Sequence, residues 1–140
     1  NSTYFSFNYS NELAIKFIVY LLSLEVNEFP KWLGVLFHNL KKFEHSIQMG
    51  LIFGSSIKRK DFNDVDILLM YAPNKSGDVK KIQDEIRKSD LIAQPIRYLE
   101  MTEKDILLKR DDKIIYNIFS DNIVFNDPEK YAEVVKRCHK

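Results

Sequence analysis

Two short apolar segments joined by a polar loop limit the possible folds of this chain more than any other feature. Met49–Phe53 and Val65–Tyr71 are nearly continuous runs of apolar residues, and turn residues follow the second run from Pro73 to Gly77. Runs of this length are typical of buried strands, which belong to sheets that are covered by other elements. A small β-sheet with helices packed on it is therefore expected.

Helical and extended patterns alternate along the rest of the chain. Apolar residues at three- and four-residue spacing predict helices, and short apolar runs between turn residues predict strands. Capping residues mark helix starts at Thr102 and at Asp127 before Pro128. The expected helices lie at about 11–24, 30–45, 76–88, 103–119 with a break at Asp111-Asp112, and from 128 onward, and further strands lie at Ile96–Met101 and Asn122–Phe125.

This order of elements predicts an α/β (α+β) fold with a small mixed sheet backed by helices. A length of 140 residues fits one domain. Hydrophobic residues make up 45% of the chain, with only four Gly and four Pro, so a disordered or fibrous chain is excluded. We expect residues 1–29 to form an N-terminal segment and helix added to a domain over residues 30–140.

Charge and cysteine content exclude several classes of function. A net charge of +1 gives no overall attraction to nucleic acid or to anionic membranes. Cys138 is the single cysteine, so an internal disulfide is impossible, and no Cys/His cluster has zinc-ligand spacing. The most apolar stretch, Leu13–Leu24, contains Lys16 and is shorter than a membrane span. With no signal-peptide pattern visible, a cytoplasmic location is expected.

The loop between the two apolar segments contains the residues best suited to chemistry. Side chains alternate along a strand, so Asp64 and Asp66 are expected to lie side by side on one face. Two adjacent carboxylates repel each other, and a divalent cation with hard oxygen ligands, Mg²⁺ or Mn²⁺, is the usual way to neutralise them. Gly54 has no Cβ, so a phosphate could approach its backbone closely, and Ser55 could donate to the same anion.

These residues resemble the nucleotidyltransferase superfamily with the DNA polymerase β-like fold, especially its small minimal members from bacteria and archaea. The shared pattern is a hydrophobic-Gly-Ser turn, a spacer and Asp-hydrophobic-Asp-hydrophobic, here LIFGSS and DVDILL. Downstream, PIRYLEMTEKDI and IIYNIFSDNIVFNDPEKY look like the strand, helix and closing strand-helix of those domains. The resemblance covers Pro30 to Tyr131.

The resemblance implies a Mg²⁺-dependent transferase that moves a nucleoside monophosphate from a nucleoside triphosphate (NTP) to a hydroxyl of a protein, RNA or small molecule. It implies that Asp64 and Asp66 are the catalytic carboxylates and hold Mg²⁺ or Mn²⁺. Gly54 and Ser55, with Ser56 beside them, would then bind the phosphates of the NTP. Such metal ions neutralise charge on the phosphoryl oxygens, so few other residues are needed.

One position departs from the pattern of active superfamily members. These usually have a third carboxylate on the next paired strand, and the matching residue here is Arg97. Glu100, three residues further on, is expected on the opposite face of that strand. An alternative function is therefore a catalytically weak or inactive nucleotide-binding module of a regulatory or antitoxin-like kind. A further alternative is that Arg97 neutralises Asp66 without any metal.

Two other features have both a functional and a structural interpretation. Lys58, Arg59 and Lys60 form a basic run in the loop, which could hold a triphosphate or a polyanion such as RNA, or could simply be solvated. The apolar residues of the expected helix at 11–24 are a candidate surface for a homodimer or a partner protein.

Overall fold

The computed structural model describes residues 31–89 and 92–139. The helix expected at 11–24 and Pro30 lie outside these residues. The described helices are α2 (Lys31–Leu40), α3 (Ser76–Ser89), α4 (Glu103–Leu108), α5 (Lys113–Ser120) and α6 (Pro128–Cys138), and the strands are β1 (Met49–Phe53), β2 (Val65–Met70), β3 (Ile96–Met101) and β4 (Asn122–Asn126).

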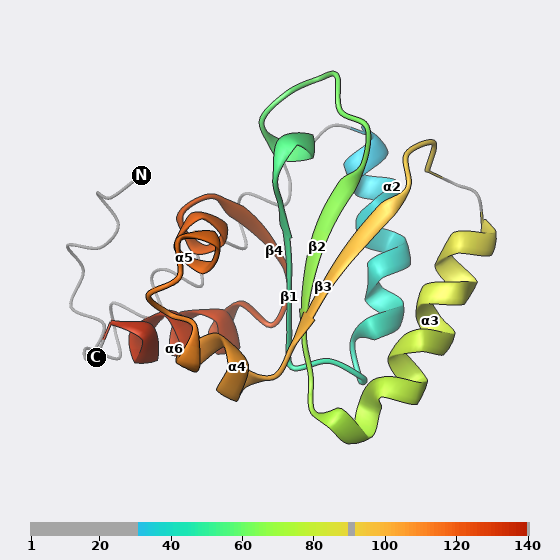
Figure 1. Cartoon of the computed structure of the whole chain (residues 1–140). Helices are drawn as coiled ribbons and strands as arrows, with labels where there is room; N and C mark the ends of the chain where they lie inside the picture. Colours follow the sequence, from blue (N-terminus) through green and yellow to red (C-terminus); the bar gives the residue numbers. More distant parts are fainter. Residues whose placement is uncertain (1–30, 90–91, 140) are drawn as a thin grey trace.

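The strands form one mixed sheet in the order β3-β2-β1-β4. β1 is antiparallel to both β2 and β4, whereas β2 and β3 are parallel. Figure 1 shows α2 and α3 on one side of this sheet and α4, α5 and α6 on the other. The predicted mixed sheet backed by helices is therefore confirmed.

Alternating side chains of the strands fill two hydrophobic cores, one on each face of the sheet. This arrangement follows from the twofold repeat of a strand, which directs successive side chains to opposite faces. The core under α2 and α3 includes Leu36, Phe43, Ile52, Ile67 and Val79. The core under α4, α5 and α6 includes Met49, Leu51, Leu68, Met70, Ile118 and Val134.

Capping side chains explain where three helices begin. At the start of α4, the Thr102 hydroxyl accepts a bond from the Asp105 backbone N–H, and the Asp105 carboxylate accepts one from the Thr102 N–H. Asp112 caps α5, which confirms the predicted break between the two helices. Asp127 caps α6, as the sequence predicted. Its backbone has a left-handed φ of 55°, which the sequence did not indicate.

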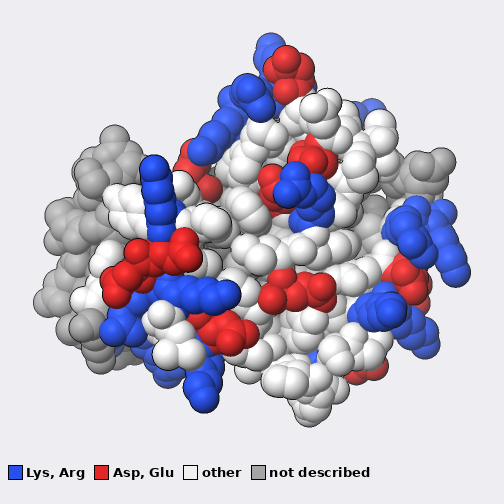
Figure 2. All heavy atoms as spheres, viewed as in Figure 1, with Lys and Arg blue, Asp and Glu red and all other residues white. Residues whose placement is uncertain are grey.

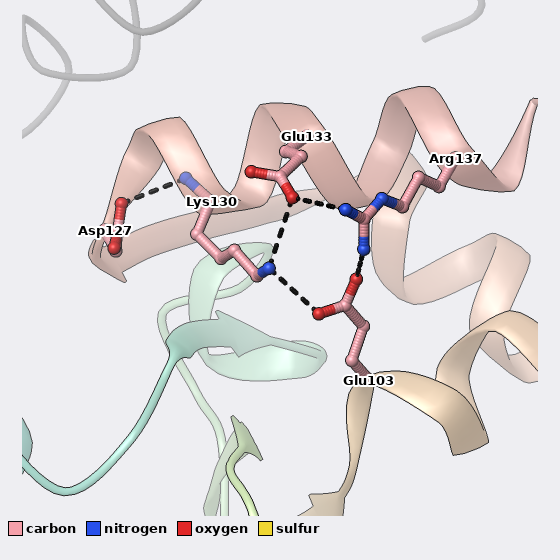
Figure 3. A network of polar contacts seen from close by, with 5 residues as sticks. All are labelled: Glu103, Asp127, Lys130, Glu133 and Arg137. Atoms are coloured by element: carbon pink, nitrogen blue, oxygen red, sulfur yellow. Dashed lines mark hydrogen bonds and ion pairs between the residues drawn. The ribbon is translucent and has the colours of Figure 1, made fainter.

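A network of ion pairs joins α4 to α6 (Figure 3). Glu103 at the start of α4 lies 2.9 Å from Nζ of Lys130 and also pairs with Arg137. Glu133 contacts the same two cations, at 3.3 Å and 2.8 Å. Burial raises the pKa of Glu103, but the bonds and charges of Lys130 and Arg137 outweigh it, and the net shift is downward. The network therefore favours the ionised form of Glu103.

The described helices are short and bury only part of their surface. In α3, Val79 and Ile86 are buried and charged residues occupy much of the remaining surface, as the sequence predicted.

Among residues 31–89 and 92–139, no helix has the length and apolar character needed to cross a membrane.

Candidate active site at the start of β2

Asp66 lies at the open end of a row of side chains that is otherwise buried. Leu68 and Met70 follow it on the same face of β2 and belong to the core under α4, α5 and α6. In Figure 1 this end of the sheet, which carries the turn after β1, lies away from α4 and α6. The side chains of Asp64 and Asp66 consequently remain 25% and 20% exposed.

Gly54 brings the turn after β1 directly against the carboxylate of Asp66. Phe53, the last residue of β1, is the antiparallel partner of Asp66. Gly54 itself has φ 82° and ψ −158°, a backbone region that is essentially restricted to glycine. A Cβ added at this position would overlap Oδ2 of Asp66. Both the backbone conformation and the neighbouring carboxylate therefore require glycine here.

The two serines after Gly54 differ in exposure. They begin a short 3₁₀ turn, Ser55–Ile57, whose hydrogen bonds are donated by the backbone N–H groups of Ile57, Lys58 and Arg59. Ser55 is partly exposed, whereas Ser56 is 5% exposed and its hydroxyl has no hydrogen-bond partner among the described residues. Gly54 and Ser55 are thus partly exposed, and the hydroxyl of Ser56 is enclosed.

Apolar contacts hold the loop between this turn and Asp64. Ile57 and Phe62 pack against the core on the α2 side, and the Phe62 ring lies 4.9 Å from the Trp32 ring, centroid to centroid. Between these anchors the basic run is exposed, with Lys58 Nζ 3.7 Å from Oδ2 of Asp121. The basic side chains therefore lie at the surface of the same loop, and among the described residues no hydrogen bond or ion pair links them to the aspartate pair.

Arg97 contacts both aspartates from the neighbouring strand. The parallel register pairs Asp66 with Arg97, as the sequence predicted. Nη1 of Arg97 lies 3.2 Å from Oδ2 of Asp64, and Nε lies 3.6 Å from Oδ1 of Asp66. Figure 2 shows basic atoms lying against acidic atoms near the upper middle of this face of the molecule. One guanidinium thus faces two carboxylates, and the cluster retains an excess of negative charge.

The pKa of Asp66 reflects its burial first and this excess charge second. Burial and the charge of Asp64 raise the pKa of Asp66, and the guanidinium of Arg97 opposes the rise without cancelling it. A cation that approached the pair would therefore be favoured by the repulsion it relieves.

Glu100 faces the other side of the sheet and does not substitute for a third carboxylate. Its Oε1 accepts hydrogen bonds from the Tyr71 hydroxyl at 2.6 Å and from Nε2 of Gln83 in α3 at 3.2 Å. Burial and the bond to Glu100 raise the pKa of Tyr71 to about 12. The predicted opposite placement of Glu100 and Arg97 is confirmed.

Asp64 and Asp66 fit a metal site that is shared with a ligand. Within residues 31–89 and 92–139, no group of three or more His, Cys, Asp or Glu side chains is arranged to hold a metal. Protein-bound Mg²⁺ commonly uses one or two carboxylates and completes its coordination with water and substrate phosphates. The two carboxylates suit a site in which water and substrate phosphates complete the coordination of the metal, and they are too few to hold a metal without such ligands.

A separate cavity of about 460 Å³ lies between α3 and β3. Its lining includes Asp84, Arg87 and Tyr98. Tyr98 packs in the core under α2 and α3, so the cavity is on the opposite face of the sheet from Asp66. We do not assign it to the chemistry of the aspartate pair.

Comparisons of the chain with family models, with curated proteins and with solved structures gave no match. The resemblance to nucleotidyltransferases therefore depends on the turn and strand residues quoted above.

Proposed function

We propose that the chain binds an NTP together with Mg²⁺ at Gly54, Ser55, Asp64 and Asp66, and transfers a nucleoside monophosphate to a hydroxyl of a protein, RNA or small molecule. The observation that carries this proposal is the close approach of Gly54 to the Asp66 carboxylate. Oδ2 of Asp66 fills the space that a Cβ at Gly54 would take, so the glycine lets the backbone of the turn lie against a candidate metal ligand. A phosphate bound by that backbone would share one site with the metal. The resemblance of LIFGSS and DVDILL to nucleotidyltransferases supplies the reaction class.

Each residue has a distinct role in this proposal. Asp64 and Asp66 would hold Mg²⁺ or Mn²⁺, Gly54 would admit the phosphates to its backbone, and Ser55 would donate its hydroxyl and N–H to them. The metal would supply neutralisation of charge on the phosphoryl oxygens, while the acceptor oxygen bonds to the α-phosphorus and pyrophosphate leaves.

A second candidate function, nucleotide binding without transfer, is favoured by the position of Arg97. Arg97 pairs with Asp66 across the parallel strands, where active nucleotidyltransferases usually have a carboxylate. A guanidinium stays protonated and cannot accept the proton of an attacking hydroxyl. In this alternative the chain is a regulatory or antitoxin-like module that binds a nucleotide or a partner protein.

Nucleotide binding is tested with the Asp64→Asn, Asp66→Asn double variant. Binding of α-labelled ATP, GTP, CTP and UTP to the full chain would be measured in Mg²⁺, in Mn²⁺ and in EDTA. We expect the wild-type chain to bind at least one NTP in a metal-dependent manner. The affinity of the double variant for that NTP should be lower by at least about tenfold, since both metal ligands lose their charge. Asp84→Asn, a change in α3 on the other face of the sheet, is the matched control.

The same samples separate the two candidate functions. Release of pyrophosphate and transfer of label, both lost in the double variant, would establish the transferase. Metal-dependent binding without pyrophosphate release would favour the binding module. Equal NTP binding by the wild-type chain and the double variant would rule out Asp64 and Asp66 as the site of either function.

A further inference from the structure

Arg97 already provides a positive charge to both aspartates, which a divalent cation bound at the pair would also contact. Its Nη1 and Nε contact Asp64 and Asp66 at 3.2 Å and 3.6 Å, so one side chain spans both carboxylates. Arg97 is also 71% exposed, far more than either aspartate. A metal ion that reached the pair from solvent would therefore meet a like charge first.

The contact is well suited to being broken by a phosphate. Ion pairs of this exposure are worth only about 0–1 kcal/mol, so the free energy that holds Arg97 on the aspartates is small. The planar guanidinium binds phosphate oxygens in a bidentate manner better than an ammonium does. A polyphosphate that lies against Gly54 and Ser55 reaches the neighbourhood of Asp66, and hence of Arg97, because Gly54 adjoins that carboxylate.

We propose that Arg97 is a resident counter-cation, which closes the Asp64–Asp66 pair to free divalent ions until a polyphosphate draws the guanidinium away. This inference rests on the proposed function, because it needs phosphate and metal to share the site. It makes metal binding depend on nucleotide binding, and by linkage nucleotide binding depends equally on metal. Arg97 is then a positioning residue that sets the order of binding.

The test is the affinity of the full chain for Mn²⁺ alone, measured from the electron paramagnetic resonance signal of free Mn²⁺. Arg97→Ala is expected to bind Mn²⁺ roughly tenfold more tightly than the wild-type chain, because a like charge has left the site. Arg97→Gln keeps most of the side-chain bulk and is expected to behave in the same way. The double variant Asp64→Asn, Asp66→Asn should bind no Mn²⁺ at this site.

Arg87→Ala is the matched control. Arg87 is similarly exposed, at 74%, and pairs with Asp84 at 3.1 Å in α3, on the other face of the sheet from Asp66. Its removal should leave the affinity for Mn²⁺ unchanged. Thermal unfolding of each variant would show that the fold is retained.

Failure of this inference is distinguishable from failure of the proposed function. If Arg97→Ala and Arg97→Gln bind Mn²⁺ no more tightly than the wild-type chain, while the wild-type chain still binds an NTP with metal, the role of Arg97 is wrong and the nucleotide site stands. If the wild-type chain binds Mn²⁺ alone as tightly as either Arg97 variant, the role is also wrong. If no NTP binds in the presence of metal, the proposed function fails.

Discussion

Gly54→Ala is expected to abolish metal-dependent NTP binding and to lower the free energy of unfolding by about 2 kcal/mol. The backbone at Gly54 has φ 82° and ψ −158°, which an alanine adopts only with strain. The new Cβ would also overlap Oδ2 of Asp66, so the carboxylate or the turn must move. Urea unfolding would measure the stability, and binding of α-labelled NTP in Mg²⁺ would measure the site.

Gly34→Ala gives a matched control for this prediction. Gly34 lies within α2 and is exposed, and an added Cβ would meet no atom of the described residues within 4 Å other than its chain neighbours and the backbone of the helix. Alanine is the better helix former, so the variant should be about 0.5–1 kcal/mol more stable and should bind NTP normally. If Gly54→Ala were as stable as the wild-type chain and bound NTP equally well, the turn would not be part of the site.

The sequence was sufficient to predict the strands and most helix boundaries because the signals are local. β1 and β3 have the predicted bounds, Met49–Phe53 and Ile96–Met101. Thr102 and Asp112 cap their helices through residues two or three positions along the chain, which a sequence pattern can represent. Helix α2 ends at Leu40, and a 3₁₀ turn over Lys41–Phe43 completes the segment that the apolar spacing indicated.

The aspartate pair and its neighbour were also predictable, because strand alternation and register follow simple rules. Asp66 and Arg97 pair across β2 and β3, and Glu100 faces away, as expected. The conformation of Gly54 was not predictable, since its φ and its contact with Asp66 arise from the way two strands meet. Burial of the Ser56 hydroxyl was missed for the same reason: a Gly-Ser-Ser sequence does not indicate which serine faces the core.

The ion pairs between α4 and α6 had no sequence signal at all. Glu103 and Arg137 are 34 positions apart, so only the packing of the two helices brings them together. Glu133 and Arg137 do lie one helical turn apart, but that spacing alone predicts a weak surface pair. The tertiary contact with Glu103 makes the Glu133–Arg137 pair part of a partly buried network of ion pairs.

Glu103→Gln is expected to lower the free energy of unfolding by about 2 kcal/mol at pH 7, because hydrogen bonds to charged groups contribute roughly 1.5–3 kcal/mol. The side chain of Glu103 is 19% exposed and that of Lys130 is 22% exposed, so water replaces the lost charge poorly. Lys130 and Arg137 would retain Glu133 as their only carboxylate in the network (Figure 3). Urea unfolding at pH 7 would measure the loss.

The pH dependence of this loss has a definite sign. Burial raises the pKa of Glu103, but the two cations lower it by more than burial raises it. The pKa in the folded chain therefore lies below the ordinary 4.5. A carboxyl whose pKa is depressed by folding contributes its full stability above its unfolded pKa, and the contribution disappears as pH falls through the folded value. The difference in stability between the wild-type chain and Glu103→Gln should therefore be constant above about pH 5 and shrink in acid.

Glu85→Gln tests whether this behaviour belongs to the network. Glu85 is an exposed residue of α3, and its replacement should change stability by less than about 0.5 kcal/mol at either pH. A loss in Glu103→Gln that is the same at pH 7 and in strong acid would mean that the charge of Glu103 is not what stabilises the contact. A loss that fades in acid would identify the ionised carboxylate as the group that holds α4 to α6, the two helices that cover the core at the end of the sheet opposite the aspartate pair.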